Sequence, residues 1–245
     1  MGHAWEQRDE VVVAGTVDEV WAAIATGPGI DSWYMGRTRV EPGPGGSVAT
    51  DMGGFVMNSA VTAWEPPNHF AYEHSDGPGQ RSIAFEYLVE GRDQGGAVVR
   101  VVTSGFLPDD DWETEFEAMT AGGQMYFRTL VAYLDHFAGR FATPVHVSGE
   151  PVADWPSAWA ALRTGLGLGE HPAVGDKVAA TVPGAGDLAG EVDFVNPQAL
   201  IVRTADGLFS FIQGFFGSFV LGHHVFADID EKEAGQAWTS WLAAL

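Results

Sequence analysis

The chain has 245 residues, which is long enough for one large domain or two of ordinary size. Hydrophobic residues make up 46% and aromatic residues 12%, which excludes a disordered chain. The protein is acidic, with 12 Lys and Arg against 33 Asp and Glu and a net charge of -21, so neither nucleic acid nor an anionic membrane is expected as a partner. The absence of cysteine excludes disulfides, thiolate metal sites and a cysteine nucleophile. Since the charged N-terminal segment also lacks the apolar core of a signal peptide, we expect a cytoplasmic protein.

A strand, a helix and a turn are predicted first along the chain. Residues 10–14 form a β-branched run that is typical of a strand. Thr16 and Glu19 have the spacing of a capping box, which predicts that a helix begins there. Glycine and proline at residues 27–29 are expected to end this helix, and residues 30–34 to form a short turn.

An antiparallel meander is predicted next, because short apolar runs alternate with Gly and Pro breakers. The predicted strands are residues 37–41, 47–52, 55–64, 69–75, 81–89 and 97–106. Alternation with period two places one set of side chains on a common, covered face. That set is Phe70, Tyr72 and His74, then Ile83, Phe85 and Tyr87, then Val99, Val101 and Thr103.

A long helix follows, since apolar residues recur at steps of three and four. Its stripe consists of Trp112, Phe116, Met119, Gly123, Phe127, Leu130 and Leu134. Gly122 and Gly123 interrupt the helix, although each glycine costs about 1 kcal/mol relative to Ala. These glycines either leave room for a molecule beneath the helix or allow close packing against a strand.

The second half of the chain repeats the first. The matching segments are residues 11–15 with 145–149, 21–24 with 159–162, 46–50 with 176–180, and 123–124 with 235–236. Matches that keep their order over this length indicate a duplication. We therefore predict two domains, residues 1–143 and a shorter copy at 144–245, with a single mixed domain as the alternative.

The order of strand, helix, meander and long helix resembles the START-like (SRPBCC) superfamily. Within it, residues 8–140 resemble the bacterial relatives of the C-terminal domain of the activator of Hsp90 ATPase. The segments that carry the resemblance are residues 17–24 with Trp33, 61–66, 70–74, 96–106 and Trp112. The resemblance implies an α+β helix-grip fold, a curved antiparallel sheet around a long C-terminal helix, here in two tandem copies. It also implies a cavity between the sheet and that helix.

A set of mainly aromatic side chains is predicted to line this cavity, because small-molecule sites are mostly apolar with a few polar groups. The predicted ligand-binding residues are Trp33, Phe55, Phe70, Tyr72, His74, Phe85, Tyr87, Phe116, Met119, Gly123 and Phe127. An ordinary packed core would produce the same aromatic stripe, so both interpretations stay open.

Several other residues are of types found in catalytic, metal or nucleotide sites, and each has a simpler interpretation. His74 and Tyr72 share a face and are the pair suited to acid-base chemistry, with a hydrogen-bonded core histidine as the alternative. His223 and His224 are neighbours in a predicted strand and face opposite sides, so no metal site is expected. The glycines of residues 165–169 follow a helix, unlike a nucleotide-binding loop, and no cofactor motif is found.

The uncharged stretch at residues 208–227 contains several polar and glycine residues, which indicates two strands and not a membrane span. The sequence thus predicts a non-catalytic protein that binds a small hydrophobic or aromatic molecule, without metal or cofactor. A protein-partner module of co-chaperone-like or regulatory type is the second hypothesis. A cyclase or hydrolase that uses His74 and Tyr72 is the third.

Overall fold

The computed structural model describes residues 2–52, 55–93, 95–108, 112–214 and 217–245. At residues 112, 114, 115 and 118 only the backbone is described, so the predicted stripe position of Trp112 lies outside the described side chains. The chain divides into two compact units, Met1–Phe141 and Ala142–Leu245, where the sequence had predicted a boundary between residues 143 and 144.

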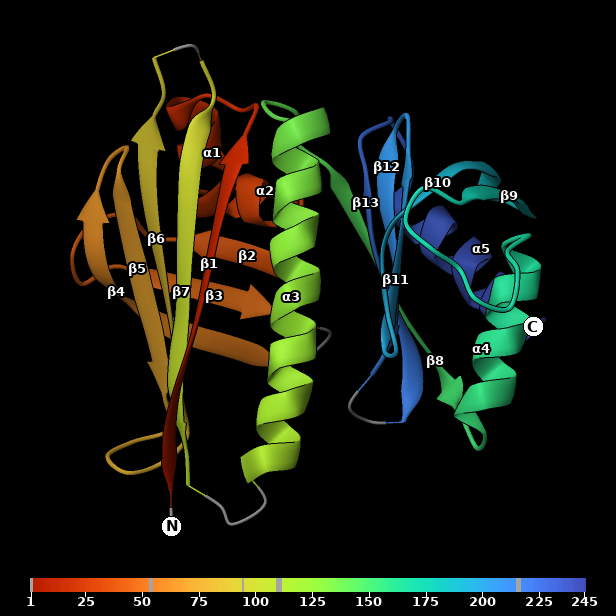
Figure 1. Cartoon of the computed structure of the whole chain (residues 1–245), viewed down its shortest axis with the longest axis horizontal. Helices are drawn as coiled ribbons and strands as arrows, with labels where there is room; N and C mark the ends of the chain where they lie inside the picture. Colours follow the sequence, from red (N-terminus) through yellow and green to blue (C-terminus); the bar gives the residue numbers. More distant parts are fainter. Residues whose placement is uncertain (1, 53–54, 94, 109–111, 215–216) are drawn as a thin grey trace. The chain divides into compact units, whose positions relative to one another are not determined.

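The first unit is a seven-stranded antiparallel sheet with three helices (Figure 1). Its elements are β1 (His3–Val13), α1 (Val17–Ala25), α2 (Gly27–Ile30), β2 (Arg37–Val40), β3 (Ser47–Asp51), β4 (Val56–Glu65), β5 (His69–Ser75), β6 (Ser82–Gly91), β7 (Ala97–Leu107) and α3 (Trp112–His136). The strand order is β1-β7-β6-β5-β4-β3-β2, so the meander is closed by the first strand pairing with the last.

The second unit repeats this topology with a six-stranded sheet. Its elements are β8 (Thr143–Pro151), α4 (Trp155–Gly165), β9 (Lys177–Val182), β10 (Gly186–Asn196), β11 (Ala199–Thr204), β12 (Gly207–Gln213), β13 (Ser218–Val225) and α5 (Glu231–Ala243). The order β8-β13-β12-β11-β10-β9 again pairs the first strand with the last. The final helix has 13 residues, against 25 in α3, so the prediction of two helix-grip copies with a shorter second one is confirmed.

Residues 208–227 were predicted to form two strands and not a membrane span, and the described part of this stretch lies mostly in β12 and β13. Within the described part of the chain, none of the helices combines the length and apolarity needed to cross a membrane.

The first strand is longer than the sequence analysis predicted, since β1 begins at His3 and not at residue 10. It pairs with β7 along its whole length, from His3 with Leu107 to Val13 with Ala97. Burial alternates along β1, so Trp5 and Gln7 face inward between exposed charged residues. Those outward charges concealed the strand when only apolar runs were considered.

The glycines after α1 do not simply end a helix, as predicted, but form the short helix α2 against it. Thr26 caps α2 by accepting a hydrogen bond from the Gly29 amide at 3.1 Å. A Cβ atom on Gly29 would lie 1.9 Å from the carbonyl oxygen of Ala22, so only glycine permits this approach of α2 to α1.

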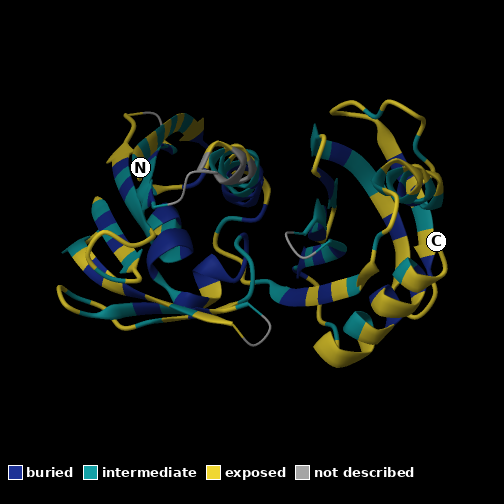
Figure 2. Ribbon diagram, turned by 90° about the horizontal axis from the view of Figure 1, so that it is seen from below, coloured by how far each residue is buried: buried dark blue, intermediate teal, exposed yellow. Residues whose placement is uncertain are grey.

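The core of the first unit lies between the α1–α2 pair and one end of the sheet. Val20, Phe70 and Val99 have no exposed surface, and α1 packs on β6 and β7. The Trp21 ring lies 5.2 Å from that of Trp64 and 6.1 Å from that of Phe70. Figure 2 shows the buried helices and the alternation of buried and exposed residues along the strands.

Replacement of Gly29 by Ala should lower the free energy of unfolding by about 2–3 kcal/mol, because the new methyl group meets the backbone of α1 and cannot be accommodated by a side-chain rotation. Urea unfolding measures the change. Gly122→Ala is the control, since nothing lies within 4 Å of a Cβ at that helical position and Ala should stabilise α3. Equal effects of the two substitutions would contradict the assigned contact.

Candidate functional site

The inner face of the first sheet is arranged in four cross-strand rows defined by the strand register. Row 1 is Val11, Val99 and Val89; row 2 is Asp9, Val101, Tyr87 and Phe70; row 3 is Gln7, Thr103, Phe85 and Tyr72; row 4 is Trp5, Gly105, Ile83 and His74. Because side chains alternate along a strand, all of these point to the same side of the sheet.

Exposure increases from row 1 to row 4 on the central strands β5 to β7. Val99 and Phe70 are fully buried in rows 1 and 2. Phe85 in row 3 is partly exposed, and in row 4 the inward-facing Ile83 and His74 are both partly exposed. The inner face is therefore closed at the α1 end of the sheet and accessible at the other end.

Helix α3 covers this face along β1 (Figure 1). The Phe116 ring lies 5.9 Å from the indole of Trp5. A Cβ atom on Gly123 would lie 3.4 Å from the Gln7 side-chain oxygen, so the glycine leaves room for Gln7. The gap expected beneath Gly123 is thus occupied by the protein's own glutamine, which sequence analysis could not place because β1 was predicted too short.

The aromatic side chains of rows 2 and 3 form what we call the aromatic wall. Two tyrosines that are not among the predicted ligand-binding residues extend it. Tyr34 follows α2, and its ring lies 4.6 Å from that of Tyr126 on α3 and 6.5 Å from that of Phe85. Tyr126 precedes the predicted stripe residue Phe127 by one position and lies three residues after Gly123, a helical spacing that could have identified it. Tyr34 lies in an irregular turn, where no periodicity marks a facing direction.

The tyrosine hydroxyl groups of this wall are uncharged hydrogen-bonding groups. Tyr72 and Tyr87 are hydrogen-bonded to each other. Burial raises the pKa of Tyr34 to about 12. Burial, reinforced by the neighbouring tyrosines, holds the pKa of Tyr72 and Tyr126 well above the usual value. None of these groups is a base at neutral pH, so they can donate a proton in a hydrogen bond but not abstract one.

The side chains of the predicted acid-base pair, His74 and Tyr72, contact different partners. His74 Nδ1 lies 2.7 Å from the Asn58 carbonyl oxygen, and Nε2 lies 3.2 Å from the Asp76 carboxylate. Both ring nitrogens face oxygen atoms of the chain, while the Tyr72 hydroxyl contacts Tyr87. This geometry matches the alternative of a hydrogen-bonded structural histidine.

The remaining predicted lining residues fall into different environments. Phe70, Tyr72, Phe85 and Tyr87 form a continuous cluster, with the Tyr72 ring 5.2 Å from Phe85 and 6.3 Å from Tyr87. Trp33 is buried and donates its indole N–H to the Ala23 carbonyl oxygen at 3.0 Å, so it anchors α1. Phe55 is 62% exposed before β4, outside this cluster. The partly buried lining residues of α3 are Phe116, Met119, Gly123 and Phe127.

Two buried polar atoms on the inner face lack a hydrogen-bond partner among the described residues: Trp5 Nε1 and Ser59 Oγ. Trp5 belongs to row 4, and the pairing of Ala60 with Glu73 places Ser59 beside His74 in the same row. Unpaired buried polar groups are uncommon in folded proteins. They therefore identify row 4 as the part of the inner face with unmet hydrogen-bonding capacity.

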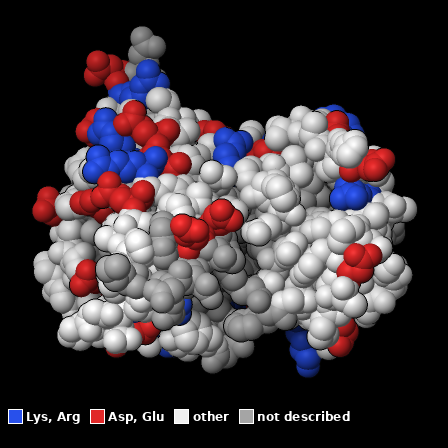
Figure 3. Space-filling model, turned by 60° about the horizontal axis from the view of Figure 1, so that its bottom comes forward, with Lys and Arg blue, Asp and Glu red and all other residues white. Residues whose placement is uncertain are grey.

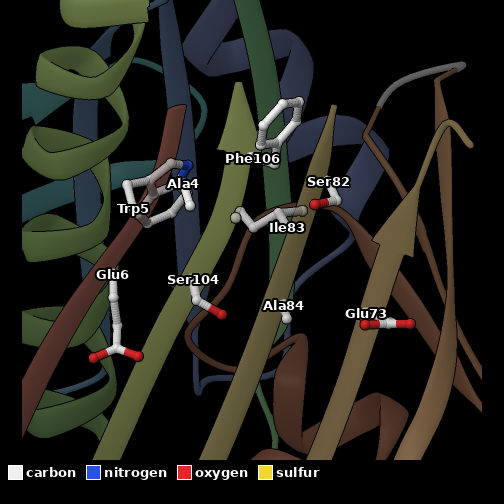
Figure 4. A pocket seen from close by; sticks show the side chains of 10 residues that line it. Ala4, Trp5, Glu6, Glu73, Ser82, Ile83, Ala84, Ser104 and Phe106 are labelled. Atoms are coloured by element: carbon white, nitrogen blue, oxygen red, sulfur yellow. The ribbon is translucent and has the colours of Figure 1, made fainter. Parts of the chain in front are cut away.

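The outer face of the same sheet carries a separate depression of about 580 Å³ (Figure 4). Glu6 and Glu73 lie on its two sides, on β1 and β5, with Ser104 and Ala84 between them. Glu73 thus faces away from Tyr72, as strand alternation predicts. Trp5, Ile83 and Phe106 also contribute to the lining, so apolar as well as acidic residues border this depression.

Charged side chains of both signs are interspersed on the surface drawn in Figure 3. On the outer face of the first sheet, Arg100 contacts the carboxylates of Glu10 and Glu90. Exposed pairs of this kind contribute little to stability. No cluster of His, Asp or Glu able to hold a metal ion is found in the described ranges of the chain.

The second unit has two depressions and one unusual buried histidine. A depression of about 550 Å³ is bounded by β8, α4 and α5, and one of about 530 Å³ by β8 and α5. His223 on β13 is fully buried, and neither ring nitrogen has a hydrogen-bond partner in the described structure. Its ring lies 4.3 Å from that of Trp238 and 5.1 Å from that of Phe209.

Burial holds the pKa of His223 well below 6.5, and the nearby His224 and His146 lower it further. The unfolded chain therefore binds a proton at a higher pH than the folded chain does. The free energy of unfolding should fall as the pH is lowered below about 6.5, by up to about 1.4 kcal/mol per pH unit from this group.

Urea unfolding of the second unit, followed by hydrogen exchange in α5 between about pH 7.5 and about pH 5, measures this slope. His223→Phe should flatten it, because Phe can occupy the aromatic surroundings without titrating. His171→Phe is the matched control at an exposed position of the same unit. An unchanged slope in His223→Phe would show that other groups cause the acid sensitivity.

Comparison with known proteins places this geometry in a family. Residues 14–135 match the model for "Activator of Hsp90 ATPase homolog 1-like protein". No curated protein matches the chain significantly.

Solved structures resemble the chain at low sequence identity. Protein MLL2253 from Mesorhizobium loti is 20% identical, with 54% of this chain and 98% of that one covered and a TM-score of 0.47. The di-domain ARO/CYC protein BexL from the BE-7585A biosynthetic pathway is 13% identical, with 98% and 94% covered and a TM-score of 0.49. DynU16, from the dynemicin biosynthetic locus, is 18% identical, with 97% and 96% covered and a TM-score of 0.45. At these values no site residue is transferred from them. The family match alone is specific, and through its first unit the chain belongs to the Activator of Hsp90 ATPase homolog 1-like protein family.

Proposed function

We propose that the first unit binds a small hydrophobic or aromatic molecule, without catalysis, against rows 3 and 4 of the inner face beside α3. One observation carries this proposal: inward-facing side chains that would be core residues in a closed fold remain partly exposed at this end of the sheet. Binding to an accessible apolar surface is favourable because the ligand displaces water from it.

The composition of the wall supports an aromatic ligand. Phe85 and Tyr34 pack edge to face, and Phe116 of α3 packs edge to face with Trp5. Aromatic pairs in offset or edge-to-face geometry add about 0.5–1.5 kcal/mol to the gain from buried area. A rigid three-ring molecule should therefore bind with a dissociation constant on the order of tens to hundreds of micromolar.

The arrangement of titratable groups favours binding over catalysis. His74 is engaged by Asn58 and Asp76, and the tyrosines are protonated at neutral pH. The partner hypothesis has less support, because the carboxylates of Glu6 and Glu73 border the depression on the outer face, whereas a large apolar patch is typical of an interaction surface.

Substitution Ile83→Trp tests the location of the site. The larger ring fills row 4 from the inner face, so the affinity for the neutral probe 9-fluorenone should fall at least about tenfold, a loss of about 1.4 kcal/mol. Isothermal titration calorimetry measures the affinity, and urea unfolding shows whether the variant stays folded.

Ala84→Trp is the matched control, since Ala84 is the next residue on β6 and faces the outer depression. This variant should bind 9-fluorenone as the unmodified chain does. If Ala84→Trp abolished binding and Ile83→Trp did not, the ligand site would be the outer depression and the proposal would be wrong.

A further inference from the structure

The accessible end of the inner face contains a buried hydrogen-bond donor without an acceptor among the described residues. Trp5 Nε1 is buried and has no partner among the described residues, and an indole N–H can only donate. The indole lies between the sheet and α3, with its ring 5.9 Å from that of Phe116. Beneath it is Gly105, whose Cβ would lie 2.9 Å from Nε1, so no side chain of β7 offers the indole an acceptor there.

The hydroxyl groups of this face add further donors. Tyr72 and Tyr87 together carry two hydroxyl hydrogens but share one hydrogen bond, so one hydrogen remains for another acceptor. Ser59 Oγ is buried without a partner in the described structure. A buried donor without an acceptor is unfavourable, and a ligand that supplies the acceptor removes this cost.

The charged groups of the four rows are already paired within the protein. The Asp9 carboxylate accepts a hydrogen bond from Gln7 Nε2 at 2.9 Å, and His74 contacts Asn58 and Asp76. No Lys or Arg belongs to rows 1 to 4, all of whose members are described. An anionic ligand would find no counter-charge here, whereas an uncharged oxygen needs none.

Building on the proposed function, we infer that the ligand is a flat aromatic molecule with an uncharged acceptor oxygen, such as a ketone carbonyl, which accepts a hydrogen bond from Trp5 Nε1. This contact would satisfy the indole nitrogen, which is buried at row 4 without a partner in the described part of the chain. It also separates this ligand class from hydrocarbons, fatty acids and amines of similar size.

Two probes of nearly equal shape test the inference, 9-fluorenone with a carbonyl group and fluorene without one. The unmodified chain should bind 9-fluorenone about five to ten times more tightly than fluorene, the change expected for one hydrogen bond to a buried donor. Trp5→Phe keeps an aromatic ring against Phe116 but removes the N–H. It should abolish the preference, so the ratio of the two dissociation constants should fall to about one.

Trp155→Phe is the control, because Trp155 lies in α4 of the second unit and should leave the preference intact. Circular dichroism checks folding, and if Trp5→Phe does not fold, Trp5→Leu, which also removes the N–H and keeps an apolar side chain, is used in the same comparison. Equal binding of both probes by the unmodified chain would overturn the inference and leave the proposed function standing. Binding of neither probe would overturn both. A preference for 9-fluorenone that survived Trp5→Phe would overturn the role of Trp5. Tighter binding of fluorene-9-carboxylate than of 9-fluorenone would overturn the requirement for an uncharged oxygen.

Discussion

The pairing of the first strand with the last determines what each unit can enclose. In the first unit, the antiparallel register of β1 with β7 runs through the whole length of both strands and closes the meander. This register decides which residues of β1 face inward, because a slip of one residue would exchange the inner and outer sets of side chains. Trp5 and Gln7 reach the space beneath α3 only through this pairing, and the candidate site depends on both.

The two ends of the inner face serve different purposes. At one end, α1 and α2 cover Phe70 and Val99 completely, and this end supplies the hydrophobic stabilisation of the unit. At the other end, α3 alone covers the sheet and packs on β1, so the side chains of β6 and β7 keep part of their surface accessible. A side chain that is fully buried and stabilises the unit cannot also present an accessible apolar surface. In this fold the two roles therefore fall to different positions along the strands.

The second unit shows how the same topology can carry different chemistry. Val11 of β1 pairs with Val99, whereas the matching Val145 of β8 pairs with His223. An apolar pair in the first unit is thus replaced by one that contains a buried imidazole without a hydrogen-bond partner in the described residues. The second core thus holds a titratable ring where the first holds Val99, and burial disfavours the protonated form of that ring.

The amino-acid sequence by itself determined the local structure: the capping box at Thr16, the period of two in the meander, the helical stripe toward Leu134 and the repeat that predicts two helix-grip units. Each of these signals depends on residues that are near one another in the chain. The tertiary structure alone decided that Gln7 fills the gap at Gly123, that Tyr34 meets Tyr126, and that Phe55 is exposed. The physical reason is that periodicity gives the face on which a side chain lies, whereas its burial depends on which distant segment covers that face.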